Sequence, residues 1–318
     1  MMRVAVSILN HNSAQSTVAC VQSLLNAEQE KGGAYVLEIF VADNASVERD
    51  RDILQQALAE LPTVYVKLNP ENMGFAAGHN RNIAAIFHDF NPDYVWILNN
   101  DCMVYEETLS SLIESSTRHS EVGVWGATLL EADGETVQCA GGCFYNPWIS
   151  SYRQYGRGKS LARIDLLEPV EFDYIAGASL FFPVSTLQNG LRPVSLLPAD
   201  DCMVERQWLN ESFFLYFEEL DLAQRLKPGF GMAWCKRALI KHAGGASTGT
   251  VESRRTEVAE YHSTLSALRF TRMYYSHRLW VMVPSRYISK CLLLLIRGDF
   301  RLIGSLTKAY RDFWSGSE

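Results

Sequence analysis

The first hundred or so residues alternate short apolar runs with segments of helical periodicity, and this order constrains the fold most. The apolar runs have strand length, and the segments between them repeat apolar residues every three or four positions. Such an alternation is typical of a mainly parallel, doubly wound α/β sheet. The predicted strands are `RVAVSIL` (3–9), `VLEIFVA` (36–42), `TVYVKL` (63–68) and `YVWIL` (94–98), and the predicted helices lie within residues 13–29, 48–61 and 74–90.

Three of these strands end in polar clusters: Asn10-His11-Asn12, Asp43-Asn44 and Asn99-Asn100-Asp101. Asn and Asp are also common turn residues, so turn chemistry would explain any one cluster. Ligands of open α/β sheets bind at the carboxyl ends of the strands. Three clusters on the same edge therefore predict a binding site there.

Targeting signals and cysteine usage predict a cytoplasmic protein. The sequence begins without a secretory signal, and no run reaches the roughly 18 apolar residues of a membrane span. The seven cysteines are scattered and form no CxxC pair. This pattern indicates reduced thiols, so we expect no use of the sequons at Asn44 and Asn210.

Charge is distributed unevenly between the body and the C-terminal region. Residues 254–318 carry eleven Lys and Arg against five Asp and Glu, a net charge of +6. The overall charge of −7 therefore leaves −13 for residues 1–253. The acidic body excludes a nucleic-acid partner, since its field repels phosphates. The basic region predicts contact with something anionic.

The C-terminal region is predicted to be helical from Tyr261 onward, with a break at Pro284. Two interpretations stay open for residues 270–318. The helices pack on the body or on a second subunit, as in a homodimer, or they contact a membrane peripherally. Mixed basic and apolar character favours the membrane contact.

Three familiar motifs fail on spacing. `YGRGKS` has Arg153 where a P-loop needs its first Gly, and `GASLF` has Phe181 where a nucleophile elbow needs its second. The glycines of `GFAAGH` are too far apart for a dinucleotide fingerprint. Kinase, hydrolase and dehydrogenase functions lose their main support.

An acidic cluster, `FEELDL`, holds Glu218, Glu219 and Asp221. Acids are favoured at a helix amino end, and Asp221 can pair with Arg225 one turn later. The cluster follows `FFLYF` (213–217), which we expect to be a buried strand. Acids that emerge from a core strand are costly unless they are paired or functional.

Seven segments in order resemble family 2 glycosyltransferases, especially the bacterial rhamnosyltransferase-like branch. They are `VSILNHN`, `VADNAS`, `ENMGFAAGHNRNI`, `WILNND`, `FDYIAGASLFF`, `FFLYFEELDLAQRL` and `KHAGGAS`, and they span most of residues 3–247. The resemblance implies a GT-A fold and transfer of a sugar from a nucleotide-sugar to a hydroxyl with inversion. It implies a catalytic domain at 1–253, with a nucleotide-binding half (1–105) and an acceptor half (106–253), followed by the basic helical region 254–318.

By this resemblance, `NND` stands where the family carries its DxD metal motif. Asp101 is then the carboxylate ligand of Mg²⁺ or Mn²⁺, and His242 is a further ligand of the metal or the diphosphate. Asn99 replaces the first acid of the motif, which implies weaker or water-mediated metal binding. Asp200-Asp201 offers a competing pair of carboxylates, but it follows Pro198 in an expected loop insertion.

The resemblance also assigns a nucleotide site. Asp43 accepts the N–H of a pyrimidine, which fits both a dTDP-sugar and a UDP-sugar. The glycines near residue 74 let backbone approach the nucleotide, and Arg81 meets phosphate or ribose. The assigned positions are Asn10, Asn12, Asp43, Asn44, Asn72, Gly74, Phe75, Arg81, Asn99 and Asn100.

Glu219 matches the general base of the family, where Asp is more common. Glu218 and Asp221 then orient the acceptor or hold the helix. The implied donor is dTDP-rhamnose, with a UDP-sugar as second choice. The implied acceptor is a surface polysaccharide or a lipid-linked glycan at the inner face of the plasma membrane.

Two rival functions stay open. The first is a catalytically inactive scaffold that binds a nucleotide-sugar. It would be consistent with `NND` in place of the DxD motif and with `EE` in place of `ED` at the position of the base. A nucleotidyltransferase would want a Gly-rich, basic loop after the first strand, and `NHNSAQS` provides none.

Overall fold

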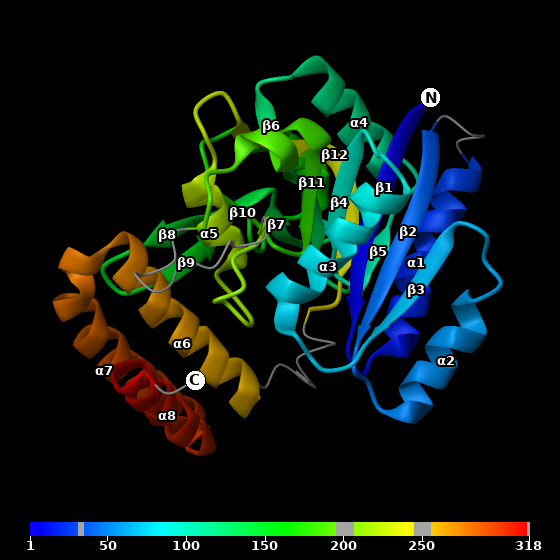
Figure 1. Cartoon of the computed structure of the whole chain (residues 1–318). Helices are drawn as coiled ribbons and strands as arrows, with labels where there is room; N and C mark the ends of the chain where they lie inside the picture. The colour runs from blue at the N-terminus through cyan, green and yellow to red at the C-terminus, as the bar shows by residue number, and fades with distance from the viewer. Residues whose placement is uncertain (31–34, 195–206, 245–255, 317–318) are drawn as a thin grey trace.

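The computed structural model describes residues 1–30, 35–194, 207–244 and 256–316 and contains one large mixed sheet covered by helices (Figure 1). Its strands arise mainly from runs that are buried on both faces, as expected for a sheet with helices on each side. Among the described residues the order across the sheet is β3 (Val64–Asn69), β2 (Tyr35–Asn44), β1 (Met2–Asn10), β4 (Tyr94–Leu98), β11 (Ser179–Pro183), β6 (Val122–Leu130), β12 (Gly231–His242) and β5 (Cys102–Val104), with β7 (Val137–Ala140) paired to β6.

The first four strands run parallel to one another, as predicted, whereas β11 pairs with β4 in the antiparallel direction. β1 lies between β2 and β4, and its register pairs Asn10 with Asp43 at the carboxyl ends. The strand order reverses direction beside β1, which is the kind of switch point where open α/β sheets bind ligands. The predicted α/β class is confirmed, and the polar clusters meet at one edge.

Alternation along β1 distributes the covering helices over two faces. Val4 and Val6 point to the face covered by α1 (Ala14–Glu30), α2 (Glu48–Leu58) and α4 (Thr108–Arg118). Ala5 points to the opposite face, which α3 (Gly74–Asp89) covers. Each face forms its own apolar cluster, because successive residues of a strand face opposite sides.

A small antiparallel sheet stands beside the large one. It consists of β10 (Tyr174–Ile175), β8 (Gly142–Asn146) and β9 (Ser151–Gln154). Gly141, at φ +81°, turns the chain tightly into β8, and a Cβ there would lie 2.5 Å from Trp234. The remaining short elements in this part are η1 (Leu161–Leu166), η2 (Thr186–Gly190) and α5 (Glu218–Arg225).

The prediction of a buried strand at `FFLYF` is wrong. Residues 212–217 form turns that lead directly into α5, and Tyr216 and Phe217 adopt φ of +69° and +77°. The apolar side chains are explained by aromatic packing instead, since Phe213 and Phe217 both contact the ring of Phe270. Burial against a helix, rather than strand pairing, produces the apolar composition here.

The C-terminal region forms a separate layer of helices at one side of the molecule (Figure 1). It contains α6 (Glu257–Tyr274), η3 (Ser276–Arg278), α7 (Leu279–Arg297) and α8 (Arg301–Ser315). α6 packs on the body through Phe270, and its other side shares an apolar cluster with α7 and α8 that includes Leu268, Met282 and Leu306. The predicted helical region is therefore confirmed.

The predicted break at Pro284 is wrong. Pro284 lies inside α7, and the chain turns earlier, at Tyr275 and η3. A proline in an early turn of a helix removes one N–H and disturbs few partners on the amino-terminal side. The hydroxyl of Ser285 donates to the carbonyl of Val281, which satisfies one of the carbonyls in this turn.

The expectation that no segment is long and apolar enough to span a membrane is also corrected. By length and composition, Ser276–Arg297 meets that requirement, since it contains an 18-residue window with a mean hydropathy of 1.5. Only 17% of that window is buried inside the protein.

Candidate functional site

Side-chain hydrogen bonds join the polar strand ends. Asn10 donates from Nδ2 to Oδ1 of Asp43 at 2.7 Å, and it accepts from Thr17. Asn100 donates to Thr17 and to Ser13 at the start of α1. The amide side chains of the first and third clusters therefore tie β1 and β4 to α1, which fixes the positions of the loops that follow these strands.

Asp43 has no exposed surface, because it organises the loop after β2. Oδ2 of Asp43 accepts the backbone N–H of Ser46 at 3.0 Å, and Oδ1 accepts from the Ser46 hydroxyl. Asn12, exposed and at φ +51°, donates its backbone N–H to the Ser46 hydroxyl, and its side chain accepts the backbone N–H of Val47. Asp43 is therefore enclosed by the loop that contains Asn12 and Ser46.

Asn44 links the ends of β2 and β3 to the start of α3. Its Nδ2 donates to the carbonyl of Gly74, and its Oδ1 accepts from Asn69 at the end of β3. Asn69 in turn accepts from Nη1 of Arg81 at 3.3 Å, and Arg81 is otherwise exposed. Asn69, which the sequence did not single out, therefore holds the guanidinium beside the strand ends.

Gly74 packs tightly against the backbone of Phe214. It adopts φ +77°, and a Cβ there would lie 2.3 Å from the carbonyl oxygen of Phe214. The backbone N–H of Phe75 donates to that same carbonyl at 2.8 Å. Asn72 accepts the N–H of Gly74 and shapes the turn. The glycine thus permits contact between the start of α3 and the segment before α5.

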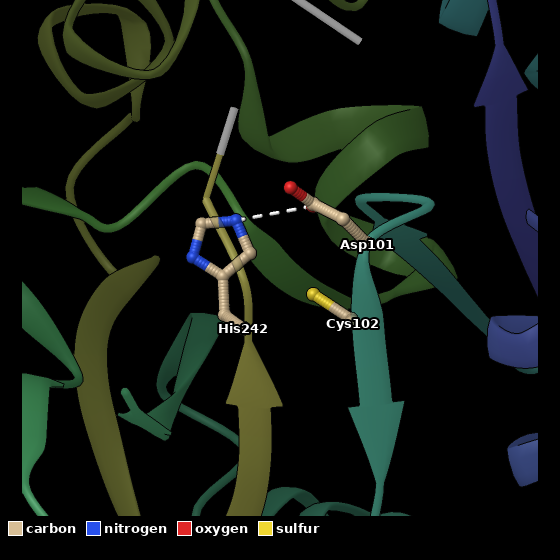
Figure 2. A group of neighbouring side chains, drawn as sticks. All are labelled: Asp101, Cys102 and His242. Carbon is tan, nitrogen blue, oxygen red and sulfur yellow. Dashed lines mark ion pairs between the residues drawn. The ribbon is translucent and has the colours of Figure 1, made fainter. Parts of the chain in front are cut away.

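A carboxylate and an imidazole face each other where β4 and β12 end and β5 begins (Figure 2). Oδ1 of Asp101 lies 3.2 Å from Nε2 of His242, and the Asn99 amide lies 3.5 Å from the same nitrogen. His242 is the last residue of β12, which pairs with β5 through Cys102. The pairing of β12 with β5 thereby brings Asn99 and His242 together, although they are 143 positions apart in the sequence.

Gln138 on β7 sets the orientation of His242. Its Oε1 lies 2.7 Å from Nδ1, while its Nε2 donates to Glu131 and to the carbonyl of His242. Because the amide nitrogen of Gln138 donates to these two oxygens, its amide oxygen is the atom that faces His242. This oxygen accepts a hydrogen bond from Nδ1, so Nδ1 carries the ring proton. The lone pair of Nε2 then faces the carboxylate of Asp101.

Oδ1 of Asp101 and Nε2 of His242, 3.2 Å apart, are close enough to bind one divalent cation together. The candidate ligand atoms of Asp101, Cys102 and His242 lie within 4.8 Å of one another. Oxygen and imidazole donors suit Mn²⁺ and Mg²⁺. The residues therefore fit a divalent ion.

Cys102 lies within this group but is not suited to bind the metal as a thiolate. Its side chain is completely buried, and Sγ donates to the carbonyl of Ala178. Burial, followed by the charge of Asp101, raises the pKa of the Cys102 thiol well above its ordinary value. The thiol therefore stays protonated and supports the loop.

Glu218 and Glu219 form a pair of neighbouring carboxyls at the start of α5. Burial raises the pKa of Glu219 to about 7. Burial, with the charge of Glu219, raises the pKa of Glu218 well above its ordinary value, and its Oε1 has no hydrogen-bond partner in the described part of the chain. The neutral form of Glu218 is therefore favoured by its surroundings, while Glu219 can exchange a proton near pH 7.

A short segment, Ala176–Ser179, connects this acid pair to the metal-ligand group. The carboxyl of Glu219 lies against Gly177, where a Cβ would come within 3.3 Å of Cδ. The carbonyl of the next residue, Ala178, accepts the backbone N–H of Asn99 and the thiol of Cys102. The two groups therefore share one backbone support.

Asp221 points into the protein and has no exposed surface. Arg225 donates to it at 2.6 Å, and Asn210 and Tyr274 donate to its other oxygen at 2.9 and 2.7 Å. These contacts join α5 to α6. Of the two roles open to Asp221, the geometry favours holding the helix.

Some residues of this site were missed by sequence reasoning, and one alternative lies outside the described residues. Gln138 lies in an ordinary strand, and only its contact with His242 distinguishes it. Gly177 was inside a quoted segment but had no assigned partner. The competing carboxylates Asp200 and Asp201 fall within 195–206, which the structure does not describe.

Comparison with known proteins identifies the family and the fold. The family profile described as glycosyl transferase family 2 matches residues 5–181, more than half of the chain. No curated protein matches the sequence.

Three solved structures share the fold at low sequence identity. GalNAc-T7 with UDP, GalNAc and Mn²⁺ superposes with a TM-score of 0.57 and 14% identity over 99% of this chain and 58% of its own. S. aureus TarS 1–349 with UDP-GlcNAc superposes with a TM-score of 0.54 and 12% identity over 98% of this chain and 80% of its own. The mannosyltransferase PcManGT from Pyrobaculum calidifontis, with GDP-Man and Mn²⁺, superposes with a TM-score of 0.52 and 12% identity over 99% of this chain and 88% of its own.

Proposed function

Because the chain belongs to glycosyl transferase family 2, we propose that it transfers a sugar from a nucleotide diphosphate-sugar to a hydroxyl group with inversion at the anomeric carbon. The observation that carries this proposal is the shared support of Ala176–Ser179. Glu219 lies against Gly177, and the carbonyl of the next residue, Ala178, accepts the backbone N–H of Asn99 in the loop of Asp101. A general base and a diphosphate-binding group beside one backbone segment suit a single displacement.

Asp101 and His242 are the residues that would hold the divalent ion, with Asn99 beside them. Such an ion neutralises the charge that develops on the leaving diphosphate. Gln138 keeps the imidazole turned toward Asp101. Similar structures contain Mn²⁺ with UDP or GDP-Man, which supports a divalent ion in this fold without fixing the sugar.

Glu219 acts as the general base and takes the proton of the acceptor hydroxyl. A carboxyl with a pKa of about 7 is half deprotonated near neutral pH. It is a stronger base than an ordinary carboxylate, and a positioned base contributes about 10²–10⁴ in rate. The neutral Glu218 places no second negative charge beside it and can donate a hydrogen bond.

The donor is proposed to be dTDP-rhamnose, with a UDP-sugar as second choice. Asp43 would accept the N–H of the pyrimidine after the loop of Asn12 opens. The proposed acceptor is a surface polysaccharide or a lipid-linked glycan, and the cytoplasmic location stays a prediction.

Calorimetry with dTDP, UDP and GDP tests the proposal, in Mn²⁺, in Mg²⁺ and in chelator. We expect metal-dependent binding of a pyrimidine nucleotide that Asp101→Ala abolishes. Turnover of the matching nucleotide-sugar, with the product configuration read by NMR, tests inversion. Binding without turnover on any donor and acceptor would favour the scaffold function. Binding unaffected by chelator and by Asp101→Ala would refute the metal site.

A further inference from the structure

The outer face of α7 exposes a continuous row of large apolar side chains. Trp280 and Ile296 are each 83% exposed, and the residues between them repeat at spacings of three, four and seven, which places them on one side of a helix. The row is about 24 Å long at 1.5 Å per residue. We call it the α7 face, and its members are Trp280, Val281, Ile288, Leu292, Leu295 and Ile296.

The opposite face of α7 is held firmly by the rest of the protein. Met282 and Leu294 are buried in the cluster shared with α6 and α8. Arg286 donates to the carbonyls of Ser150 and Ser263. Lys290 lies 3.0 Å from both oxygens of the buried Glu260. Withdrawing α7 would break this buried ion pair together with the bonds of Arg286, so the helix is held with its apolar side outward.

The charged residues around the α7 face are mainly basic. Residues 261–298 contain no Asp or Glu, and Asp299 is the one acid between Arg297 and Arg301. Arg278 lies at the amino end of the helix, and the exposed Arg297 and Arg301 lie at its carboxyl end. No ion pair involves these three arginines in the described ranges, and Arg278 stacks over the exposed Trp148 of the β8–β9 turn.

We propose that the α7 face docks into the interfacial region of a membrane that carries anionic lipids, with the helix parallel to the membrane plane. The apolar row enters the boundary between headgroups and acyl chains, with basic side chains against the lipid phosphates at both ends. The acidic body, with a net charge of −13 over residues 1–253, faces away from the anionic surface.

A second copy of the chain fits the α7 face less well. A two-fold axis would pair the face with itself, and both ends of the helix are basic. Either direction of pairing brings arginines of the two copies together, and the face supplies no acid to compensate them. Like charges across an interface disfavour association, whereas an anionic surface complements them.

Cosedimentation of the full-length protein with vesicles tests this proposal and needs no catalytic activity. We expect binding to vesicles of phosphatidylcholine with 30% phosphatidylglycerol, weaker binding to pure phosphatidylcholine, and loss of binding as salt rises. The triple variant Ile288→Ser, Leu292→Ser, Ile296→Ser should bind at least about tenfold more weakly, because about half of the apolar row is lost. Arg297→Gln with Arg301→Gln should weaken binding to anionic vesicles by about 25-fold, at about fivefold per basic residue.

Matched controls come from η1, away from the α7 face. Leu166 is 75% exposed and Arg163 lies on the same segment, so Leu166→Ser and Arg163→Gln should leave vesicle binding unchanged. Since the substituted residues are exposed, circular dichroism should show an unaltered fold. Equal binding to neutral and anionic vesicles would overturn the proposal. Absence of vesicle binding would also overturn it. If sedimentation velocity then showed a dimer that the triple variant dissociates, the α7 face would be an interface between two copies of the chain.

Discussion

Oδ1 of Asp101 lies 3.2 Å from Nε2 of His242, although the two residues approach from different strands. The pairing of β5 with β12 produces this contact, and Gln138 turns the imidazole toward it. The contact defines where a divalent ion would bind.

Replacing Asp101 by Ala should weaken Mn²⁺ binding by at least about 100-fold, because loss of an outer partner of a metal site already costs 10–100-fold. Calorimetric titration of Mn²⁺ into the protein without nucleotide measures the change. Asp165→Asn, at an almost fully exposed carboxylate, serves as the control and should bind Mn²⁺ normally. Unchanged affinity in Asp101→Ala would place the metal elsewhere.

Replacing Gln138 by Leu should weaken Mn²⁺ binding by about 10–100-fold, because the ring of His242 loses the acceptor that fixes Nδ1–H. Gln138→Glu should retain most of the affinity, since a carboxylate oxygen can accept the same hydrogen bond. The same titration measures both variants, with Gln56→Leu on the exposed side of α2 as control. A Leu variant that binds Mn²⁺ like the wild type would show that Gln138 does not position His242.

The pH dependence of kcat/KM should reflect Glu219. Its pKa is raised to about 7, and the base works deprotonated, so the rate should rise about tenfold per pH unit below 7 and level off above 8. Glu219→Gln should lower kcat/KM by about 10²–10⁴-fold and should also lose the rise of the rate with pH below 7. Glu168→Gln, at an exposed position, should keep the wild-type rate and the wild-type pH dependence. A profile that retains its acidic limb in Glu219→Gln would assign the limb to another group.

Gly177→Ala should lower kcat and leave nucleotide affinity unchanged. The new Cβ would come within 3.3–3.4 Å of Cδ and Oε1 of Glu219, so the carboxyl must move by a few tenths of an ångström. A misplacement of 1 Å can cost about 10²-fold, so we expect about a tenfold loss. Gly304→Ala, where a Cβ meets nothing within 4 Å, should change neither value. An unaltered kcat would show that the position of Glu219 against Gly177 is unimportant.

Asp221→Ala should destabilise the protein by about 3–5 kcal/mol, because it leaves Arg225 buried without its carboxylate partner. Urea unfolding followed by circular dichroism measures the free energy of unfolding. Glu114→Ala removes an exposed ion pair with Arg118 and should cost less than about 1 kcal/mol. Similar small losses in both variants would mean that Asp221 is not a structural link between α5 and α6.

The sequence determined the α/β class and the edge of the sheet that carries the polar residues. Both follow from local patterns, namely the alternation of strand and helix periodicity and the polar ends of the strands. The segments around Asp101 and Glu219 were also recognisable, because their residue types and order match a family.

Only the tertiary structure decided which of those side chains face one another. `FFLYF` has the composition of a strand, yet packing against Phe270 makes it a turn. Asp221 and Glu219 are two positions apart, yet their surroundings differ. Asp221 is bonded to Arg225 and Tyr274, whereas Glu219 lies against Gly177.

Gln138 illustrates the same limit, since nothing in its neighbourhood along the chain marks it out. Its role depends on contact with a residue 104 positions away. The physical reason is that periodicity and propensity act over a few residues, whereas contacts between distant segments depend on how the strands pair. The sequence by itself therefore located the candidate site on the sheet, and the pairing of β12 with β5 and β6 decided its geometry.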